Sequence, residues 1–201
     1  MEKARGVTSS RRPLVRWRLI LAGGAALGFA LAFWIRSFLL IGVYIIQDSM
    51  LPTLQQGDMV LVYQRAYRRH PPQFGDIVVF PYPRGTEEEK DLVVKRVVGL
   101  PGDVIRITPK GLWRNGAPLA EWYVEEPNMA PPYQTFVVPE GHVFLMGDNR
   151  NWSEDSRDYG SVPISQLLGR VVAIYWPLER FRFFKREPVY PRPLLPQPFP
   201  E

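Results

Sequence analysis

Cysteine is absent from the 201-residue chain, and histidine occurs only at His70 and His142. Without thiols the chain has neither a disulfide framework nor a thiolate metal site. Two histidines are too few for a histidine-rich metal centre. Neither histidine has an obvious carboxylate partner nearby in the sequence, so a Ser–His–Asp triad is a poor interpretation. We therefore expect no metal and no cofactor.

Net positive charge is confined to the first 18 residues. The formal net charge is +5, and residues 1–18 carry six basic side chains against one acidic side chain. The rest of the chain carries 19 basic and 19 acidic side chains and is therefore neutral. A nucleic-acid-binding protein needs a basic face on its folded domain. We expect no nucleic-acid partner.

A long apolar run follows this basic tail. Residues 19–35, LILAGGAALGFALAFWI, contain no charged side chain. The run is at the short end for a spanning helix, and the preceding basic residues favour a cytoplasmic N-terminus. We predict a basic cytoplasmic tail over 1–18 and a transmembrane anchor over 19–35 in the lipid bilayer. The anchor extends to about residue 46, or residues 38–46 form an apolar strand.

A cleaved secretory signal is the alternative interpretation of the same run. Against it, the run is long, ends in bulky residues and has no clear small-x-small site before Gln47. An uncleaved anchor fits the pattern better. The protein is then expected in the cytoplasmic membrane as a single-pass protein, with its C-terminal domain outside the cytoplasm.

The pattern beyond residue 54 is that of β-strands, so the expected fold class is mainly β. Short apolar or alternating runs occur at 58–63, 76–80, 92–99, 103–107, 135–138, 142–147 and 170–176. Glycine and proline separate them, and Asn115–Gly116 predicts a hairpin turn. We expect an extracytoplasmic β domain over 38–184, with a small inserted second β region at about 108–135.

Two segments do not fit this strand pattern. Residues 86–91, TEEEKD, are highly charged, and we predict a solvated loop there. Residues 185–201 contain six prolines, which cannot continue a sheet. We predict an extended or disordered tail for this last segment.

Lysine is rare in this chain, with five lysines against twenty arginines. Lys95 lies in the run DLVVKRVVGLPGD, where the period of a strand puts it on one face with Val93 and Val97. Burial would lower its pKa by up to about 3–5 units, and a neutral amine can take a proton from a serine. Arginine stays charged and could not do this. Alone, however, Lys95 is better explained as an edge-strand lysine whose amine reaches water.

A serine partner would decide between these two interpretations. Ser49 lies in QDSMLPTL, residues 47–54, directly after the apolar run. Taken alone, Ser49 is also a common turn residue. A second polar stretch, GDNRNWSEDSRDYG at 147–160, could by itself be a solvated loop. Its acidic spacing does not match a calcium-binding loop.

Taken together, these segments carry a family likeness. The sequence resembles the bacterial type I signal peptidases, also called leader peptidases, over the N-terminal segment and about residues 36–176. Four motifs occur in the family's order: DSMLPTL (48–54), FGDIVVF (74–80), KRVVGLPGD (95–103) and GDNRNWSEDSRDYGSVP (147–163). The resemblance implies a membrane-bound Ser–Lys endopeptidase. Its substrates would be the signal peptides of exported preproteins, cut after small residues of the Ala-x-Ala type, and the export machinery is a further expected partner.

The resemblance also implies the roles of individual residues. Ser49 matches the nucleophile and Lys95 the general base. Ser153 matches a serine that orients the lysine amine. The remaining supporting positions form two polar pairs: Asp155 with Arg157, and Asp148 with Arg96.

Substrate-binding positions follow from the same likeness. Met50 and Pro52 match the turn that presents the nucleophile, and Val94 matches a residue lining the pocket for a small side chain. Gln47 departs from the Ser, Thr or Gly that is common at its position. The Ser49 backbone N–H and the Gln47 amide are the candidates for the oxyanion hole.

Two other functions stay open at this point. One is a related Ser–Lys protease that cleaves itself or one dedicated partner. The other is a catalytically silent, membrane-anchored β domain that binds or assembles with other proteins. Cleavage of several exported preproteins would separate the first from a general peptidase, and covalent labelling of Ser49 would separate the second from an enzyme.

Overall fold

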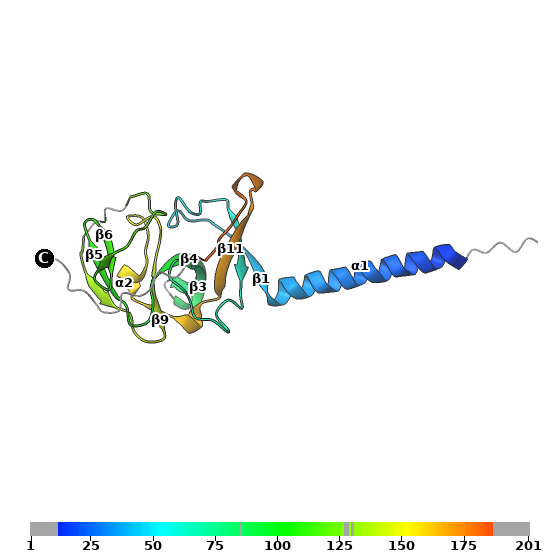
Figure 1. Cartoon of the computed structure of the whole chain (residues 1–201), viewed down its shortest axis with the longest axis horizontal. Coiled ribbons are helices and arrows are strands. Elements are labelled where there is room, and N and C mark those ends of the chain that lie inside the picture. The colour runs from blue at the N-terminus through cyan, green and yellow to red at the C-terminus, as the bar shows by residue number, and fades with distance from the viewer. Residues whose placement is uncertain (1–11, 85, 127–128, 130, 187–201) are drawn as a thin grey trace, which may run out of the picture. The chain divides into compact units, whose positions relative to one another are not determined.

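The computed structural model describes residues 12–84, 86–126, 129 and 131–186. It contains two compact units, Met1–Leu39 and Leu40–Glu201, the second of which we call the β unit (Figure 1). Most of the predicted basic tail, residues 1–11, lies outside the described residues. So does most of the predicted proline-rich tail, from residue 187 onward.

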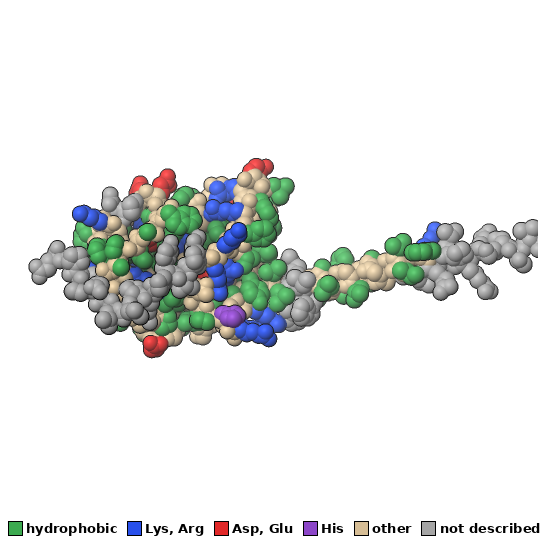
Figure 2. Space-filling model, viewed as in Figure 1, with side chains coloured by type: hydrophobic (Ala, Val, Ile, Leu, Met, Phe, Trp, Pro, Cys, Tyr) green, Lys and Arg blue, Asp and Glu red, His purple; other side chains and the backbone are tan. Residues whose placement is uncertain are grey.

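The first unit contains one long helix, α1 (Arg12–Phe38). Figure 2 shows hydrophobic side chains along its described part, and Phe29 and Leu27 are among the most exposed of them. Within the described residues, no helix is both long enough and apolar enough to cross a membrane. The transmembrane anchor predicted over 19–35 is therefore not confirmed. Its uncharged run of 17 residues lies between Arg18 and Arg36, and a spanning helix needs about 20.

The β unit confirms the predicted fold class, which is mainly β with antiparallel pairing. Its larger sheet has eight strands in the order β1-β2-β11-β3-β4-β9-β10, with β12 also paired to β11. These strands are β1 (Leu40–Tyr44), β2 (Met59–Tyr63), β3 (Ile77–Arg84), β4 (Thr86–Gly99), β9 (His142–Met146), β10 (Val162–Pro163), β11 (Gly169–Trp176) and β12 (Arg182–Phe183). Three short helices complete it: α2 (Ser156–Tyr159), η1 (Ile164–Gln166) and η2 (Leu178–Arg180).

Strand β1 decides between the two alternatives for residues 38–46. Helix α1 ends at Phe38, and β1 pairs antiparallel with β2 from Leu40 opposite Tyr63 to Tyr44 opposite Met59. Val43 and Ile45 are buried in the core of the larger sheet. The apolar residues after the helix therefore form a strand of the β unit.

The charged segment TEEEKD was predicted to be a loop, and this prediction is wrong. Residues 86–91 form the first part of β4, which pairs antiparallel with β3 through Pro83 opposite Lys90 and Tyr82 opposite Asp91. Continued pairing with β3 supplies backbone hydrogen bonds to these residues, and this outweighs the weak strand preference of glutamate and lysine.

A second, four-stranded sheet has the order β7-β6-β5-β8. It consists of β5 (Val104–Thr108), β6 (Gly111–Arg114), β7 (Ala117–Pro118) and β8 (Thr135–Val137). The predicted Asn115–Gly116 turn joins β6 to β7, and both residues have positive φ angles of 52° and 81°. Asn115 suits this backbone and is also held in place, because its side-chain Nδ2 donates to Asp103 Oδ1 at 2.8 Å.

The core of the larger sheet supports the segment around Ser49. Met50 and Leu54, on either side of the cis peptide bond Leu51–Pro52, are buried against Val60, Val79 and Ile174. The turn from β1 toward β2 is therefore anchored by its apolar residues. Ser49, the polar residue directly before Met50, stays partly exposed.

Candidate active site

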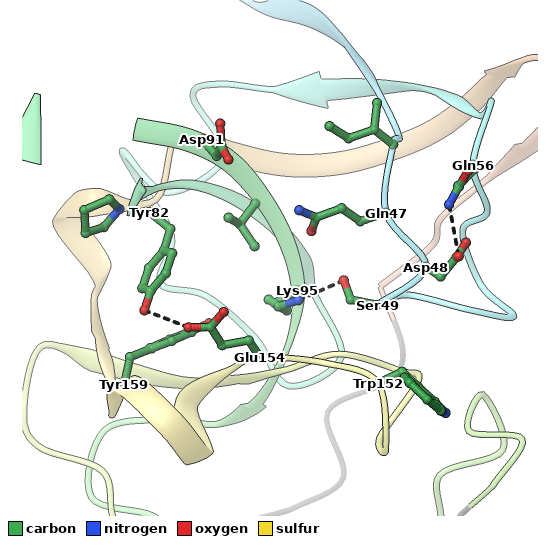
Figure 3. Close-up of a pocket in the computed structure, with 13 residues that line it drawn as sticks. Gln47, Asp48, Ser49, Gln56, Tyr82, Asp91, Lys95, Trp152, Glu154 and Tyr159 are labelled. Carbon is green, nitrogen blue, oxygen red and sulfur yellow. Dashed lines mark hydrogen bonds between the residues drawn. The ribbon is translucent and has the colours of Figure 1, made fainter. Parts of the chain in front are cut away.

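Ser49 and Lys95 meet in the β unit, although they come from different elements. Ser49 lies in the turn after β1, and Lys95 lies within β4. The Lys95 Nζ atom donates a hydrogen bond to Ser49 Oγ at 2.8 Å (Figure 3). Both the hydroxyl and the amine also face a single cavity. The two residues matched to the nucleophile and the base are therefore in direct contact.

The surroundings of Lys95 favour a neutral amine. Its side chain is only 2% exposed. Burial lowers the pKa of Lys95 to about 8, and the nearby Arg157 acts in the same direction. The carboxylates of Asp155 and Glu154 oppose this change. A lysine with such a pKa is partly neutral near pH 8 and can accept a proton, which an ordinary surface lysine rarely does.

A large cavity of about 730 Å³ opens beside the Ser49–Lys95 pair. Its walls come from the turn before and at Ser49, from the β3–β4 hairpin and from the loop around α2. The lining residues are Ile46, Gln47, Asp48, Ser49, Gln56, Tyr82, Pro83, Asp91, Val93, Lys95, Trp152, Glu154 and Tyr159. Figure 3 shows Tyr82, Glu154 and Tyr159 gathered on the side of Lys95 away from Ser49.

A second, much smaller cavity lies on the other side of β4. It measures about 30 Å³, and most of its lining residues are apolar in type. Its lining residues are Val43, Tyr44, Ile45, Ile46, Gln47, Ser49, Met50, Leu92 and Val94. Val94 and Met50 thus lie where the sequence placed them, against a small pocket that reaches Ser49. Pro52 is exposed and lines neither cavity.

Gln47 is the residue that departs from the family pattern. It is exposed and lines both cavities. Figure 3 shows its side chain extending into the larger cavity, near the Ser49–Lys95 hydrogen bond. An amide in this position has a donor within the space that a substrate would enter.

Ser153 does not make the contact that the resemblance implies. Its Oγ atom is buried and, within the described part of the chain, has no hydrogen-bond partner. It lies against Gly147, where an added Cβ atom would meet both Ser153 Oγ and the Ser49 carbonyl oxygen. Glycine at 147 therefore allows Ser153 and the Ser49 backbone to approach one another.

The predicted pair of Asp155 and Arg157 is formed. Arg157 Nε donates to Asp155 Oδ1 at 2.8 Å, and the Asp155 side chain is fully buried. Asp155 is also the N-cap of α2 and accepts a hydrogen bond from the Gly147 backbone N–H at 3.1 Å. One carboxylate thus fixes the loop on both sides of Ser153.

The second predicted pair, Arg96 and Asp148, is also formed and is buried. Arg96 donates from Nε to Asp148 Oδ1 at 2.8 Å and from Nη2 to Asp148 Oδ2 at 2.6 Å. The same guanidinium stacks over the Tyr123 ring at 3.9 Å and donates to the Thr53 hydroxyl. Arg96 therefore ties the strand carrying Lys95 to the turn after Ser49.

Sequence reasoning missed several residues around the site. Arg150, in the last motif, forms a buried two-point pair with Glu121, at 2.6 and 2.7 Å. Tyr82, Tyr159, Glu154 and Trp152 line the large cavity. Trp152, Glu154 and Tyr159 belong to the motif 147–163, so their nearness to Ser153 was a usable signal. Nothing in the sequence around Tyr82 indicated its place, because a strand pairing brings it there.

Comparison with known proteins identifies the family of this chain. The family described as signal peptidase, peptidase S26, matches residues 16–176. A probable signal peptidase I-1 of Synechocystis sp. is 41% identical over 157 residues, covering 75% of this chain and 79% of the relative. Signal peptidase I of Leptolyngbya laminosa is 37% identical over 170 residues, covering 82% of each. A solved signal peptidase I from Enterococcus faecalis V583 is 32% identical with a TM-score of 0.43, covering 50% of this chain and 97% of that one.

The family match and the relatives show that the protein is a hydrolase, and specifically a serine peptidase. The chain belongs to the signal peptidase family, peptidase S26, which confirms the resemblance read from the four motifs.

Proposed function

We propose that this chain cleaves the signal peptides of exported preproteins, with Ser49 as nucleophile and Lys95 as general base. The observation that supports this most is the 2.8 Å hydrogen bond from Lys95 Nζ to Ser49 Oγ. It occurs where burial lowers the pKa of Lys95 to about 8. A hydroxyl and a partly neutral amine in contact are what base-assisted acyl transfer needs.

The substrate is expected to bind as an added strand along β4. Strand β3 pairs with β4 along its length, whereas β9 pairs with it only from Arg96 onward. Among the described residues, the β9-side edge of residues 91–95 therefore has no strand beside it. An extended peptide can fill such an edge with main-chain hydrogen bonds, and this brings its scissile bond to Ser49.

The small apolar cavity supports cleavage after small side chains. Its volume of about 30 Å³ has room for little more than a methyl group. Successive side chains of an extended strand alternate between faces, so the residues at −1 and −3 point the same way. The cavity then restricts the −1 residue to small side chains such as alanine, and −3 faces the same side, in keeping with the Ala-x-Ala rule that the resemblance implies.

The reaction proceeds in two proton-balanced halves. Neutral Lys95 takes the Ser49 Oγ proton as Oγ attacks the carbonyl carbon, and Lys95 gives this proton to the departing amine. The peptide bond breaks, and an acyl ester forms on Ser49. Lys95 then takes a proton from water, and the hydroxide attacks the ester. The Lys95 ammonium returns this proton to Ser49 Oγ as the ester bond breaks, and the signal peptide leaves with a new carboxyl group that loses its proton to solvent.

The oxyanion that develops during acylation and again during deacylation needs hydrogen-bond donors. The Ser49 backbone N–H is one candidate, and the Gln47 side-chain amide is the second. Asp155 with Arg157 and Asp148 with Arg96 act as positioning pairs, because they hold the loop at Ser153 and the strand at Lys95. We assign Ser153 a positioning role beside the lysine amine, as the resemblance implies.

We place this activity at the membrane, with the N-terminal segment as the attachment and the first residues in the cytoplasm. The uncharged run 19–35 after a strongly basic stretch supports this, as do the exposed apolar side chains of α1. In addition, apolar side chains are exposed at Leu178, Phe181 and Phe183 of the β unit. Alkaline carbonate extraction of cell membranes distinguishes a spanning segment, which stays in the pellet, from a peripheral one.

Cleavage of preproteins with alanine at −1 and −3 tests this function. The native chain should cut several different exported preproteins, and Ser49→Ala and Lys95→Ala should each abolish cutting. Cleavage of one partner only, or of the chain itself only, would support the dedicated protease instead. No cleavage and no covalent labelling of Ser49 would support a silent binding domain.

A further inference from the structure

The large cavity beside Ser49 carries negative charge that the proposed mechanism does not use. The carboxylates of Asp48 and Glu154 line it, and among the described lining residues Lys95 is the one basic side chain. Glu154 accepts a hydrogen bond from the Tyr82 hydroxyl at 3.2 Å, and Asp48 accepts one from Gln56 Nε2 at 3.0 Å. Both of these partners are neutral. When Lys95 is neutral, as catalysis requires, Glu154 and Asp48 therefore face no positive charge from the described residues that line the cavity.

Strand β4 separates this acidic cavity from the small apolar one. Leu92 and Val94 line the small cavity, while Asp91, Val93 and Lys95 line the large cavity. This is the alternation of a strand, in which every second residue faces the same side. A peptide added along the same edge must obey the same alternation.

The alternation assigns the substrate's side chains to the two cavities. With the −1 side chain in the small cavity and −3 on the same side of β4, the side chain at −2 points to the other side of β4 and enters the large cavity. The aromatic rings there suit a long cationic side chain, since Tyr82 and Tyr159 lie 4.7 Å apart between centroids and Trp152 is exposed. Rings can pack against an alkyl stem and attract its charged end.

We propose that the large cavity is a subsite for a lysine or arginine side chain at position −2 of the substrate, with Glu154 as its main charged contact. The inference rests on the proposed function, because it takes the substrate strand along β4 from there. Within that function it adds a preference for one class of side chain between the two small ones.

The test uses four matched peptide substrates with alanine at −1 and −3, and alanine, lysine, norleucine or glutamate at −2. The measured quantity is kcat/KM for each peptide relative to the alanine peptide, at low ionic strength. We expect lysine to exceed alanine by about two- to fivefold, as partly exposed charge pairs allow, and glutamate to fall below alanine. Salt should reduce the lysine advantage.

Two variants locate the preference. Glu154→Gln should bring the lysine-to-alanine ratio close to one, and Glu154→Lys should favour the glutamate peptide instead. Glu140→Gln, which removes an exposed carboxylate outside the cavity lining, should leave the ratio at its native value. Each ratio is taken within one enzyme preparation, so partial misfolding or a changed Lys95 pKa does not affect it.

The outcomes separate this proposal from the function on which it rests. If the native chain does not cleave the alanine peptide or any preprotein, the proposed function fails. If it cleaves the alanine peptide but treats lysine, alanine and glutamate at −2 alike, the subsite alone is overturned. A norleucine peptide as good as the lysine peptide, or a lysine preference that survives Glu154→Gln, would also overturn it.

Discussion

Lys95 Nζ lies 2.8 Å from Ser49 Oγ, although the two residues are 46 positions apart in the chain. The contact is made where Lys95 is almost fully buried, and its ammonium form is therefore penalised. The contact with Ser49 and the burial of Lys95 together determine how cleavage responds to pH and to substitution.

The pH dependence of cleavage should follow the protonation of Lys95. Since the neutral amine is the active form, kcat/KM should rise about tenfold per pH unit below pH 8 and level off above it. Asp155, Glu154 and Asp148 raise this pKa, while Arg157 lowers it. Glu154→Gln should therefore move the rise to lower pH. A profile that is flat between pH 6 and 9 would contradict a lysine base.

Lys95→Met should stabilise the protein at neutral pH while abolishing cleavage. The folded-state pKa of about 8 lies below the ordinary value of 10.5, so the unfolded chain holds the proton more tightly. The charged lysine thus destabilises the folded state below pH 8, and this cost disappears as the pH rises toward 10.5. Urea unfolding should show a gain of about 1–3 kcal/mol at pH 6.5. A loss of stability there would contradict the burial argument.

Gly147→Ala adds only one methyl group, but it should lower cleavage activity strongly. The added methyl group would meet the Ser49 carbonyl oxygen and Ser153 Oγ, and the Gly147 N–H is tied to Asp155 at 3.1 Å. The loop must therefore shift, and the Ser49–Lys95 contact shifts with it. We expect kcat to fall by at least about 100-fold, which is the order of effect of a 1 Å misplacement. Gly24→Ala in α1, where the added methyl group meets nothing within 4 Å and no positive φ angle is involved, serves as the comparison; its activity should stay near native.

Ser153→Ala should impair cleavage without lowering stability. Ser153 Oγ is buried and has no hydrogen-bond partner among the described residues, so its removal breaks no such bond. If the hydroxyl acts beside the lysine amine during the reaction, kcat should drop while the urea midpoint stays constant. Equal losses in both would show a structural role, and no loss in kcat would remove Ser153 from the mechanism.

Local pattern was a reliable guide to the β unit. The strand around Lys95 and the turn at Asn115–Gly116 were predicted from alternation and turn chemistry, because both are short-range effects. The pattern failed at residues 86–91, where pairing with β3 outweighs the charge of the side chains. The anchor predicted over 19–35 is not confirmed, because no helix in the described part of the chain qualifies as a membrane span.

The site itself could be predicted only in part. The four motifs named Ser49, Lys95 and the two polar pairs, but only folding brings such distant residues into contact. The acidic cavity could not be predicted, because Tyr82 and Glu154 meet across 72 positions of sequence. The motif also could not show whether Ser153 Oγ has a hydrogen-bond partner, because this depends on atomic positions and not on residue types.

The most direct test of the central claim uses the absence of cysteine from the chain. In Lys95→Cys the new thiol is unique, and 2-bromoethylamine converts it into a lysine analogue at that position alone. Preprotein cleavage should be absent in the unmodified variant, should return after alkylation and should stay absent when Ser49→Ala is added. Activity in unmodified Lys95→Cys, or none after complete alkylation of a folded protein, would contradict a catalytic pair of Ser49 and Lys95.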